Sequence, residues 1–102
     1  MNDEEKLEKE IQEKGLTAPR ITPDYIKKII KEVDYYVFPN SLLTVCCMTL
    51  NNGFNVTGTS ACVSKENFDK EIGQKVAYKK AFDEIWQLEG YLLKQFLFEE
   101  EK

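Results

Sequence analysis

Residues 42–62 read LLTVCCMTLNNGFNVTGTSAC, two β-prone runs joined by Asn51-Asn52-Gly53. Asn and Gly tolerate the positive φ angles of tight turns between antiparallel strands, so this stretch predicts a β-hairpin. It lies within residues 35–64, which carry no charged side chain although 31% of the whole chain is charged. Because charged side chains are rarely buried, we expect this uncharged block to supply the core.

The hairpin's register follows from its hydrophobic pattern. A three-residue loop pairs Leu50 with Phe54 and Met48 with Val56, whereas a two-residue loop at Asn52-Gly53 would mix the two faces of the hairpin. The first register is therefore expected. It puts on one face Leu42, Thr44, Cys46, Met48, Leu50, Phe54, Val56, Gly58, Ser60 and Cys62. It puts on the other face Leu43, Val45, Cys47, Thr49, Asn55, Thr57, Thr59 and Ala61.

The second face is uncharged and mixes Thr and Asn with Val, Leu and Cys. Open water normally attracts Lys and Glu to a surface, so this composition fits an interface or a ligand pocket better. The alternative is that a helix or the N-terminal arm covers it.

A helix is expected before the hairpin, over residues 23–33. Thr22-Pro23-Asp24 supplies an N-cap acceptor, a proline at the first helical position and an acid at the positive end of the helix dipole. One apolar stripe follows at helical spacing, formed by Ile26, Ile29, Ile30 and Val33. Residues 34–40 are then either a short edge strand or an extended connector that ends at Pro39.

A long helix is expected after the hairpin, from Lys65 onward with Ser64 as its N-cap. Its small residues Gly73, Ala77 and Ala81 recur every four positions. Such a seam lets another backbone come close, within the fold or between subunits, and we take it as a candidate oligomer interface. Gly90 lies inside the pattern and predicts a bend.

The fold class predicted from these elements is α+β, with a short N-terminal helix, a central antiparallel hairpin and a long bent C-terminal helix. Residues 21–98 form the single domain and residues 99–102 an acidic tail. Residues 1–20 form a charged arm, flexible or helical. This arm is either solvated or docked on a neighbouring subunit.

Charge and cysteine content exclude several function classes. The net charge of −4 argues against broad capture of nucleic acid or anionic membranes. No apolar run approaches the ~20 residues that span a bilayer, and the acidic first residues are unlike a secretory signal, so we expect a cytoplasmic protein. Cys46, Cys47 and Cys62 have no histidine to pair with and no zinc spacing, which predicts reduced thiols and no metal.

Several motifs resemble one phage family. In the uncharged block they are Tyr35-Tyr36-Val37-Phe38-Pro39, Thr44-Val45-Cys46-Cys47, Asn52-Gly53-Phe54, Val56-Thr57-Gly58 and Ser60-Ala61-Cys62. Beyond it they are Asn67-Phe68-Asp69, Glu71-Ile72-Gly73, Ile85-Trp86 and Leu88-Glu89-Gly90-Tyr91-Leu92-Leu93. In this order they resemble the gene-49/gene-66-like family of small bacteriophage proteins, over roughly residues 21–97. The resemblance implies a phage or prophage origin, hence a bacterial host, and supplies no catalytic residues.

Enzymatic activity is not expected. The chain lacks a nucleophile paired with a base, a carboxylate pair in the uncharged block and a glycine-rich phosphate loop. No cofactor is implied. The acids on the helices, such as Asp69, Asp83 and Glu84, are most simply solvated surface charges.

The leading functional hypothesis is a non-catalytic, homo-oligomeric binding protein that sequesters a small nucleotide-type immune signal of the host, such as a cyclic nucleotide or an ADP-ribose derivative. Lysines would meet phosphates, aromatic rings would stack on a base, and Thr and Asn would orient polar edges. The candidate ligand-binding residues are Tyr36, Phe38, Asn55, Thr57, Thr59, Lys75, Lys79, Lys80 and Trp86. The alternative is a protein-interaction module that binds a host or phage protein and no small ligand.

Overall fold

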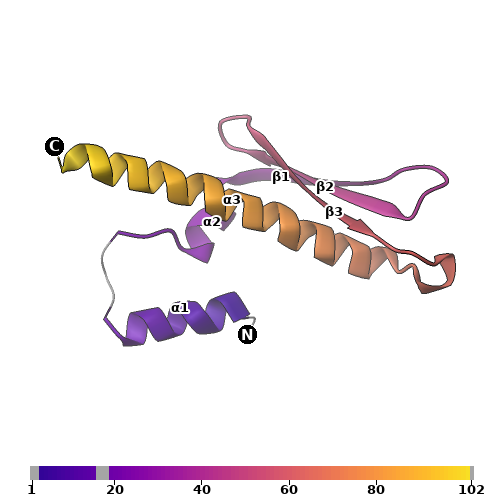
Figure 1. The fold of residues 1–102 in the computed structure, drawn as a ribbon, viewed down its shortest axis with the longest axis horizontal. Helices are drawn as coiled ribbons and strands as arrows, with labels where there is room; N and C mark the ends of the chain where they lie inside the picture. The colour runs from indigo at the N-terminus through magenta and orange to yellow at the C-terminus, as the bar shows by residue number, and fades with distance from the viewer. Residues whose placement is uncertain (1–2, 16–18, 102) are drawn as a thin grey trace.

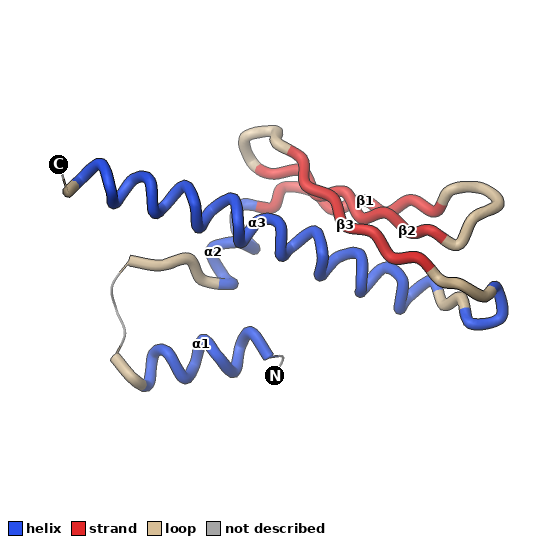
Figure 2. Tube along the Cα trace, viewed as in Figure 1, coloured by secondary structure: helices blue, strands red, loops and turns tan. Residues whose placement is uncertain are grey.

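A three-stranded sheet packs on one long helix. The computed structural model describes residues 3–15 and 19–101, and its strands pair antiparallel in the order β1-β2-β3. The helix α3 lies across one face of the sheet (Figure 1), and the separate colouring of helices and strands in Figure 2 shows these two layers. In chain order the elements are α1 (Asp3–Glu13), α2 (Pro23–Ile29), β1 (Ile30–Val37), β2 (Leu43–Leu50), β3 (Asn55–Ala61), a 3-10 turn (Lys65–Asn67) and α3 (Lys70–Glu100). The predicted α+β class is confirmed.

The hairpin has the register that its pattern predicts. Met48 lies opposite Val56, and the N–H of Leu50 donates to the carbonyl oxygen of Phe54 at 2.8 Å across the three-residue loop. Gly53 has a φ of 89°, which explains why glycine stands there. The face toward α3 is buried at Thr44, Cys46, Met48, Leu50, Val56 and Gly58.

The predicted helix over residues 23–33 is wrong in its second half. Thr22 does cap it by accepting from the N–H of Tyr25, but the helix ends at Ile29 and the chain passes directly into β1. Ile30 then pairs with Leu50 and Val33 with Met48. β-Branched residues favour strands, and the hydrogen bonds offered by β2 override the helical spacing of the stripe. The edge strand that we considered for residues 34–40 is therefore present as β1, but it begins earlier, at Ile30.

The start of α3 also differs from the prediction. Ser64 leads into the 3-10 turn and its hydroxyl contacts Glu66, whereas Asp69 is the residue that caps α3. The Asp69 carboxylate accepts from the N–H of Ile72 at 3.1 Å. From Lys70 the helix continues through Gly90 without interruption.

The small-residue seam of α3 faces its own sheet. A Cβ built on Gly58 would lie 2.2 Å from the carbonyl oxygen of Ala77 and 2.4 Å from the nitrogen of Ala81. Both alanines are fully buried, and a Cβ on Gly73 would lie 3.0 Å from the Thr44 hydroxyl. The seam therefore forms the contact between helix and sheet within one chain, and not the oligomer interface predicted for Gly73, Ala77 and Ala81.

The N-terminal arm contains α1, none of whose residues is buried. An ion pair connects it to the segment before α2: the Arg20 guanidinium donates to both carboxylate oxygens of Glu8, one of these bonds being 2.6 Å long. This hydrogen bond holds the pKa of Glu8 below its usual range.

Gly58→Ala tests the close approach of β3 and α3. Its methyl group would meet backbone atoms, which cannot rotate away as a side chain can, so we expect a loss of at least about 3 kcal/mol in the free energy of unfolding. Chemical denaturation of the wild type and the variant measures this difference in the free energy of unfolding.

Gly90→Ala is the matched control, because nothing lies within 4 Å of a Cβ at that helical position. Alanine should raise the free energy of unfolding by about 1 kcal/mol through its helix propensity. Equal effects of the two substitutions would contradict the contact that we describe at Gly58.

Thr44→Val tests a second feature of the buried face. The Thr44 hydroxyl is buried and has no hydrogen-bond partner. Valine has the same shape without the polar atom, so the free energy of unfolding should rise by about 1 kcal/mol. A decrease measured by the same denaturation would show that the hydroxyl does have a partner in solution.

Candidate functional site

The best candidate for a small-ligand site is a hollow of about 360 Å³ where β1 meets the beginning of α3. We call it the β1–α3 pocket. Neighbouring side chains along β1 point to opposite faces of the sheet. Because β1 is an edge strand, side chains from both faces can line one pocket that wraps around the free edge of the sheet. It is lined by Tyr35, Tyr36, Val37, Phe68, Lys70 and Gln74.

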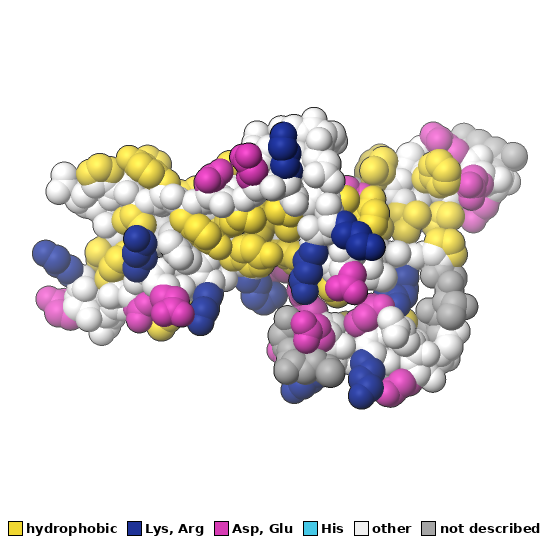
Figure 3. All heavy atoms as spheres, turned by 180° about the vertical axis from the view of Figure 1, so that it is seen from behind, with side chains coloured by type: hydrophobic (Ala, Val, Ile, Leu, Met, Phe, Trp, Pro, Cys, Tyr) yellow, Lys and Arg dark blue, Asp and Glu magenta, His cyan; other side chains and the backbone are white. Residues whose placement is uncertain are grey.

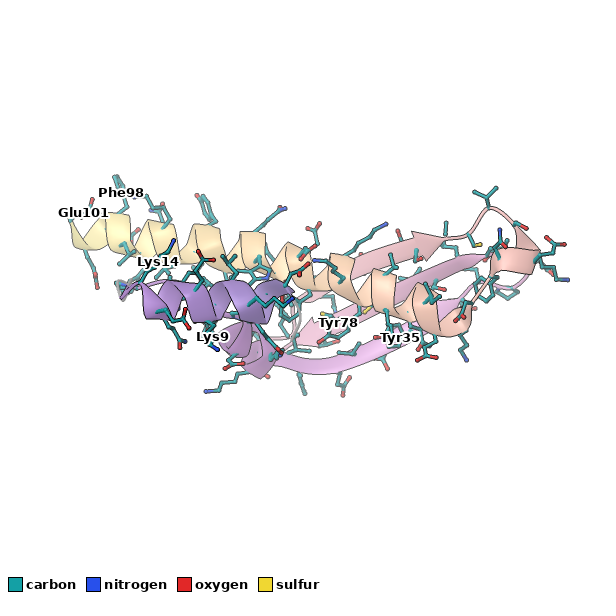
Figure 4. All side chains as sticks on the ribbon, turned by 90° about the horizontal axis from the view of Figure 1, so that it is seen from below. Lys9, Lys14, Tyr35, Tyr78, Phe98 and Glu101 are labelled. Atoms are coloured by element: carbon teal, nitrogen blue, oxygen red, sulfur yellow. The ribbon has the colours of Figure 1, made fainter. Side chains whose placement is uncertain are left out.

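Tyr35 points to the helix side of the sheet, since it lies directly opposite the buried Cys46. Partial burial raises the pKa of Tyr35, and the nearby Cys46 and Tyr78 add to this rise because a phenolate would meet further negative charge. Figure 4 shows Tyr35 of β1 and Tyr78 of α3 near each other. The Tyr35 hydroxyl therefore stays protonated at neutral pH and can donate a hydrogen bond.

Tyr36 points to the opposite face and extends the aromatic surface of the pocket. Its ring meets that of Phe38 edge to face, with the ring centroids 4.9 Å apart and the planes at 84°. Both rings are about half exposed. An exposed aromatic pair of this kind offers a stacking surface to a planar group.

The second candidate surface is the face of the sheet that points away from α3, which we call the open face. Figures 1 and 2 place α3 and the N-terminal arm on the other side of the sheet. Its centre is uncharged, and the side chain of Asn55 donates to the Thr49 hydroxyl at 2.9 Å. From the strand register the open face comprises Glu32, Asp34, Tyr36, Leu43, Val45, Cys47, Thr49, Asn55, Thr57, Thr59 and Ala61.

The structure divides the predicted ligand-binding residues between two sides of the sheet. On the open-face side lie Tyr36, Phe38, Asn55, Thr57 and Thr59. On the helix side lie Lys75, Lys79, Lys80 and Trp86. One chain therefore does not bring these nine residues to a single ligand.

The residues of the helix-side group have contacts of their own. Lys75 pairs with Glu71 and Lys79 with Asp83, each at 3.5 Å along the helix surface. Trp86 is partly buried against the core, with its ring 6.5 Å from that of Phe82. The lysine pairs are typical of surface residues, and the packing of Trp86 is typical of a residue at the edge of the core.

The lining residues of the β1–α3 pocket that lie in α3 or just before it were missed from the sequence, namely Phe68, Lys70 and Gln74. Their proximity depends on where α3 begins and on how far β1 extends, and both boundaries were predicted incorrectly. The motif Asn67-Phe68-Asp69 was the available signal, because an aspartate in that place can cap a helix.

The cysteines are free thiols, with Cys46 buried and Cys47 and Cys62 partly buried. Burial raises the pKa of Cys46, which keeps this thiol protonated and weakly reactive. Among residues 3–15 and 19–101 no group of three His, Cys, Asp or Glu side chains is arranged to hold a metal ion. In the same residues no helix is long and apolar enough to cross a membrane.

Comparison with curated proteins and with solved structures gave no significant match. One family model does match, over residues 21–97, which cover the whole sheet and nearly all of α3. This range agrees with the resemblance found in the sequence motifs and leaves the arm outside. The chain belongs to the phage protein family described as N4 Gp49/phage Sf6 gene 66.

Proposed function

We propose that this phage protein is a non-catalytic binding protein that sequesters a small nucleotide-type signal of host defence. It would do so as a homo-oligomer in the cytoplasm of the bacterial host. The observation that carries the proposal is the β1–α3 pocket, whose lining combines the aromatic residues Tyr35, Tyr36 and Phe68 with Lys70.

The dimensions and chemistry of the pocket support a nucleotide-type ligand. Its 360 Å³ falls within the range of small-molecule sites, about 300–1,000 Å³. Aromatic faces stack on bases of any sequence, and the amide of Gln74 can pair with a base edge. Lys70 is the first residue of α3, and its ammonium group can pair with a phosphate.

The charge of the pocket supports an oligomer. Lys70 is the one cation among its lining residues, whereas a cyclic dinucleotide or an ADP-ribose derivative carries two phosphates. A second copy of the chain would be the simplest source of another cation. The phage family supplies the biological setting, because a phage benefits when it removes a signal that its host uses in defence.

Isothermal titration calorimetry with a panel of cyclic nucleotides and ADP-ribose derivatives tests the proposal. Lys70→Ala should weaken the binding of the best ligand by about 10- to 100-fold, because it removes a charge-assisted hydrogen bond. Tyr36→Ala should weaken it through lost stacking.

Lys79→Ala is the matched control for this titration, as it removes a lysine from the same helix that pairs with Asp83 and does not line the pocket. The control should bind like the wild type. Absence of heat with every ligand of the panel would reject the proposal, as would equal losses in the Lys70 and Lys79 variants.

A second candidate function is favoured by the open face. Its uncharged centre exposes Thr57 and Thr59 and leaves Val45 and Cys47 only partly covered, which is typical of protein interfaces depleted in charge at their centre. Under this function the face binds a host or phage protein.

Affinity capture from phage-infected cells, followed by binding measurements with the identified partner, tests the second function. Thr57→Lys should weaken that binding at least about 10-fold, because it places an unpaired cation at the centre of the interface. In a Cys62→Ser background the partner should also slow the labelling of the Cys47 thiol, the remaining accessible cysteine of the described residues. A partner that Thr57→Lys still binds with unchanged affinity would show that another surface is used.

A further inference from the structure

The last part of α3 projects beyond the sheet. The helix has 31 residues and is about 46 Å long at 1.5 Å per residue, whereas the eight-residue strands reach only about 27 Å. The difference, about 20 Å, corresponds to roughly the last thirteen residues of the helix. Figure 1 shows this end of α3 extending past the sheet. We call residues 88–100 the overhang.

The overhang continues the apolar seam of α3 without the sheet to cover it. Ile85 is fully buried, and Leu88 and Leu92 follow it at helical spacing on the same side of the helix. Leu92 is nevertheless 61% exposed, Phe96 59% and Tyr91 74%. Figure 3 shows hydrophobic side chains gathered over this end of the molecule, next to its acidic tip.

A groove runs beside the overhang. The segment before α2 forms its other wall, and the Tyr25 hydroxyl donates to the Glu89 carboxylate at 3.4 Å across one end. The groove has a volume of about 480 Å³. Its apolar walls come mainly from Pro19, Ile21, Tyr25, Leu92, Leu93 and Phe96.

We propose that the overhang and its groove bind the overhang of a second copy of this chain. A two-fold symmetric interface requires that one surface carry both the projecting side chains and the hollow that receives them. The overhang meets this requirement, because Tyr91 and Leu92 project from the same helix that forms one groove wall. The inference would stand even if the β1–α3 pocket bound no ligand.

The exposed area is sufficient for a dimer. At about 200 Å² for a whole large apolar side chain, Leu88, Tyr91, Leu92 and Phe96 together expose roughly 500 Å². Two copies therefore offer roughly 1,000 Å² before the groove walls are counted, the area from which specific interfaces begin. A patch of about 500 Å² lies within the range of the largest apolar patch on a monomer, and such patches often mark interaction sites.

Charge sets the relative direction of the two helices. The tip of α3 carries Glu99, Glu100 and Glu101, so a parallel pair would bring six carboxylates together. An antiparallel pair keeps the two tips apart and opposes the two helix dipoles favourably. In that arrangement Leu88 faces Phe96 of the second copy, and the two Leu92 side chains meet at the two-fold axis.

Sedimentation velocity of the full chain over a range of micromolar concentrations tests the proposal. The wild type should approach twice the chain mass of 11.9 kDa. Leu92→Glu should weaken dimerisation at least about 100-fold, because two carboxylates would meet at the axis. Tyr91→Glu, at a position 74% exposed, should weaken it as well with little risk to folding.

Ile72→Glu is the matched control, since it replaces an exposed apolar residue in the first half of the same helix. It should leave the dimer intact. Circular dichroism should show the same helix content in all variants, so that a lost dimer is not mistaken for a lost fold.

A disulfide test checks the geometry. In a Cys47→Ser, Cys62→Ser background, Leu92→Cys should give a covalent dimer on mild oxidation, and Ile72→Cys should not. A wild type that stays monomeric at every concentration would overturn the inference. A dimer that both glutamate variants of the overhang leave unchanged would overturn it too. Neither result decides whether the β1–α3 pocket binds a ligand, which the titration measures separately, but a monomer would remove the second copy proposed as the source of another cation.

Discussion

The contact between Gly58 and the backbone of α3 is the constraint on which the rest of the structure depends. Because no side chain separates β3 from Ala77 and Ala81, the long helix lies almost directly on the sheet. This closeness lets a small number of buried side chains, such as Met48 and Ile85, form one continuous core. It also fixes the position of α3 along the strand, and thereby places the β1–α3 pocket at one end and the overhang at the other.

The sequence predicted the parts of the fold that depend on local chemistry. Asn51-Asn52-Gly53 and the alternating pattern around it define the hairpin register, because the three-residue loop puts Met48 and Leu50 on the same face as Val56, whereas a two-residue loop would mix the faces. The boundary between α2 and β1 could not be predicted in the same way. The spacing of Ile26, Ile29, Ile30 and Val33 satisfies a helix, and only pairing with β2, a contact distant in sequence, makes the latter two extended.

The candidate site was less predictable than the fold, for a related reason. Tyr36 was identified because an aromatic ring can stack on a base. Lys70 and Phe68 were not, because their position depends on the start of α3, which Asp69 and not Ser64 determines. The small-residue seam was recognised correctly as a close contact but assigned to the wrong partner, since spacing alone does not tell whether a sheet or another helix approaches.

The direct passage from α2 into β1 couples distant parts of the molecule. A connecting loop would absorb small rotations of a helix, but here Ile29 ends α2 and Ile30 already pairs with Leu50. Tyr25, on the same short helix, contacts Glu89 of the overhang. A second subunit bound in that groove would therefore twist the beginning of β1. The aromatic residues farther along β1 would then change their ring orientation or their fluorescence.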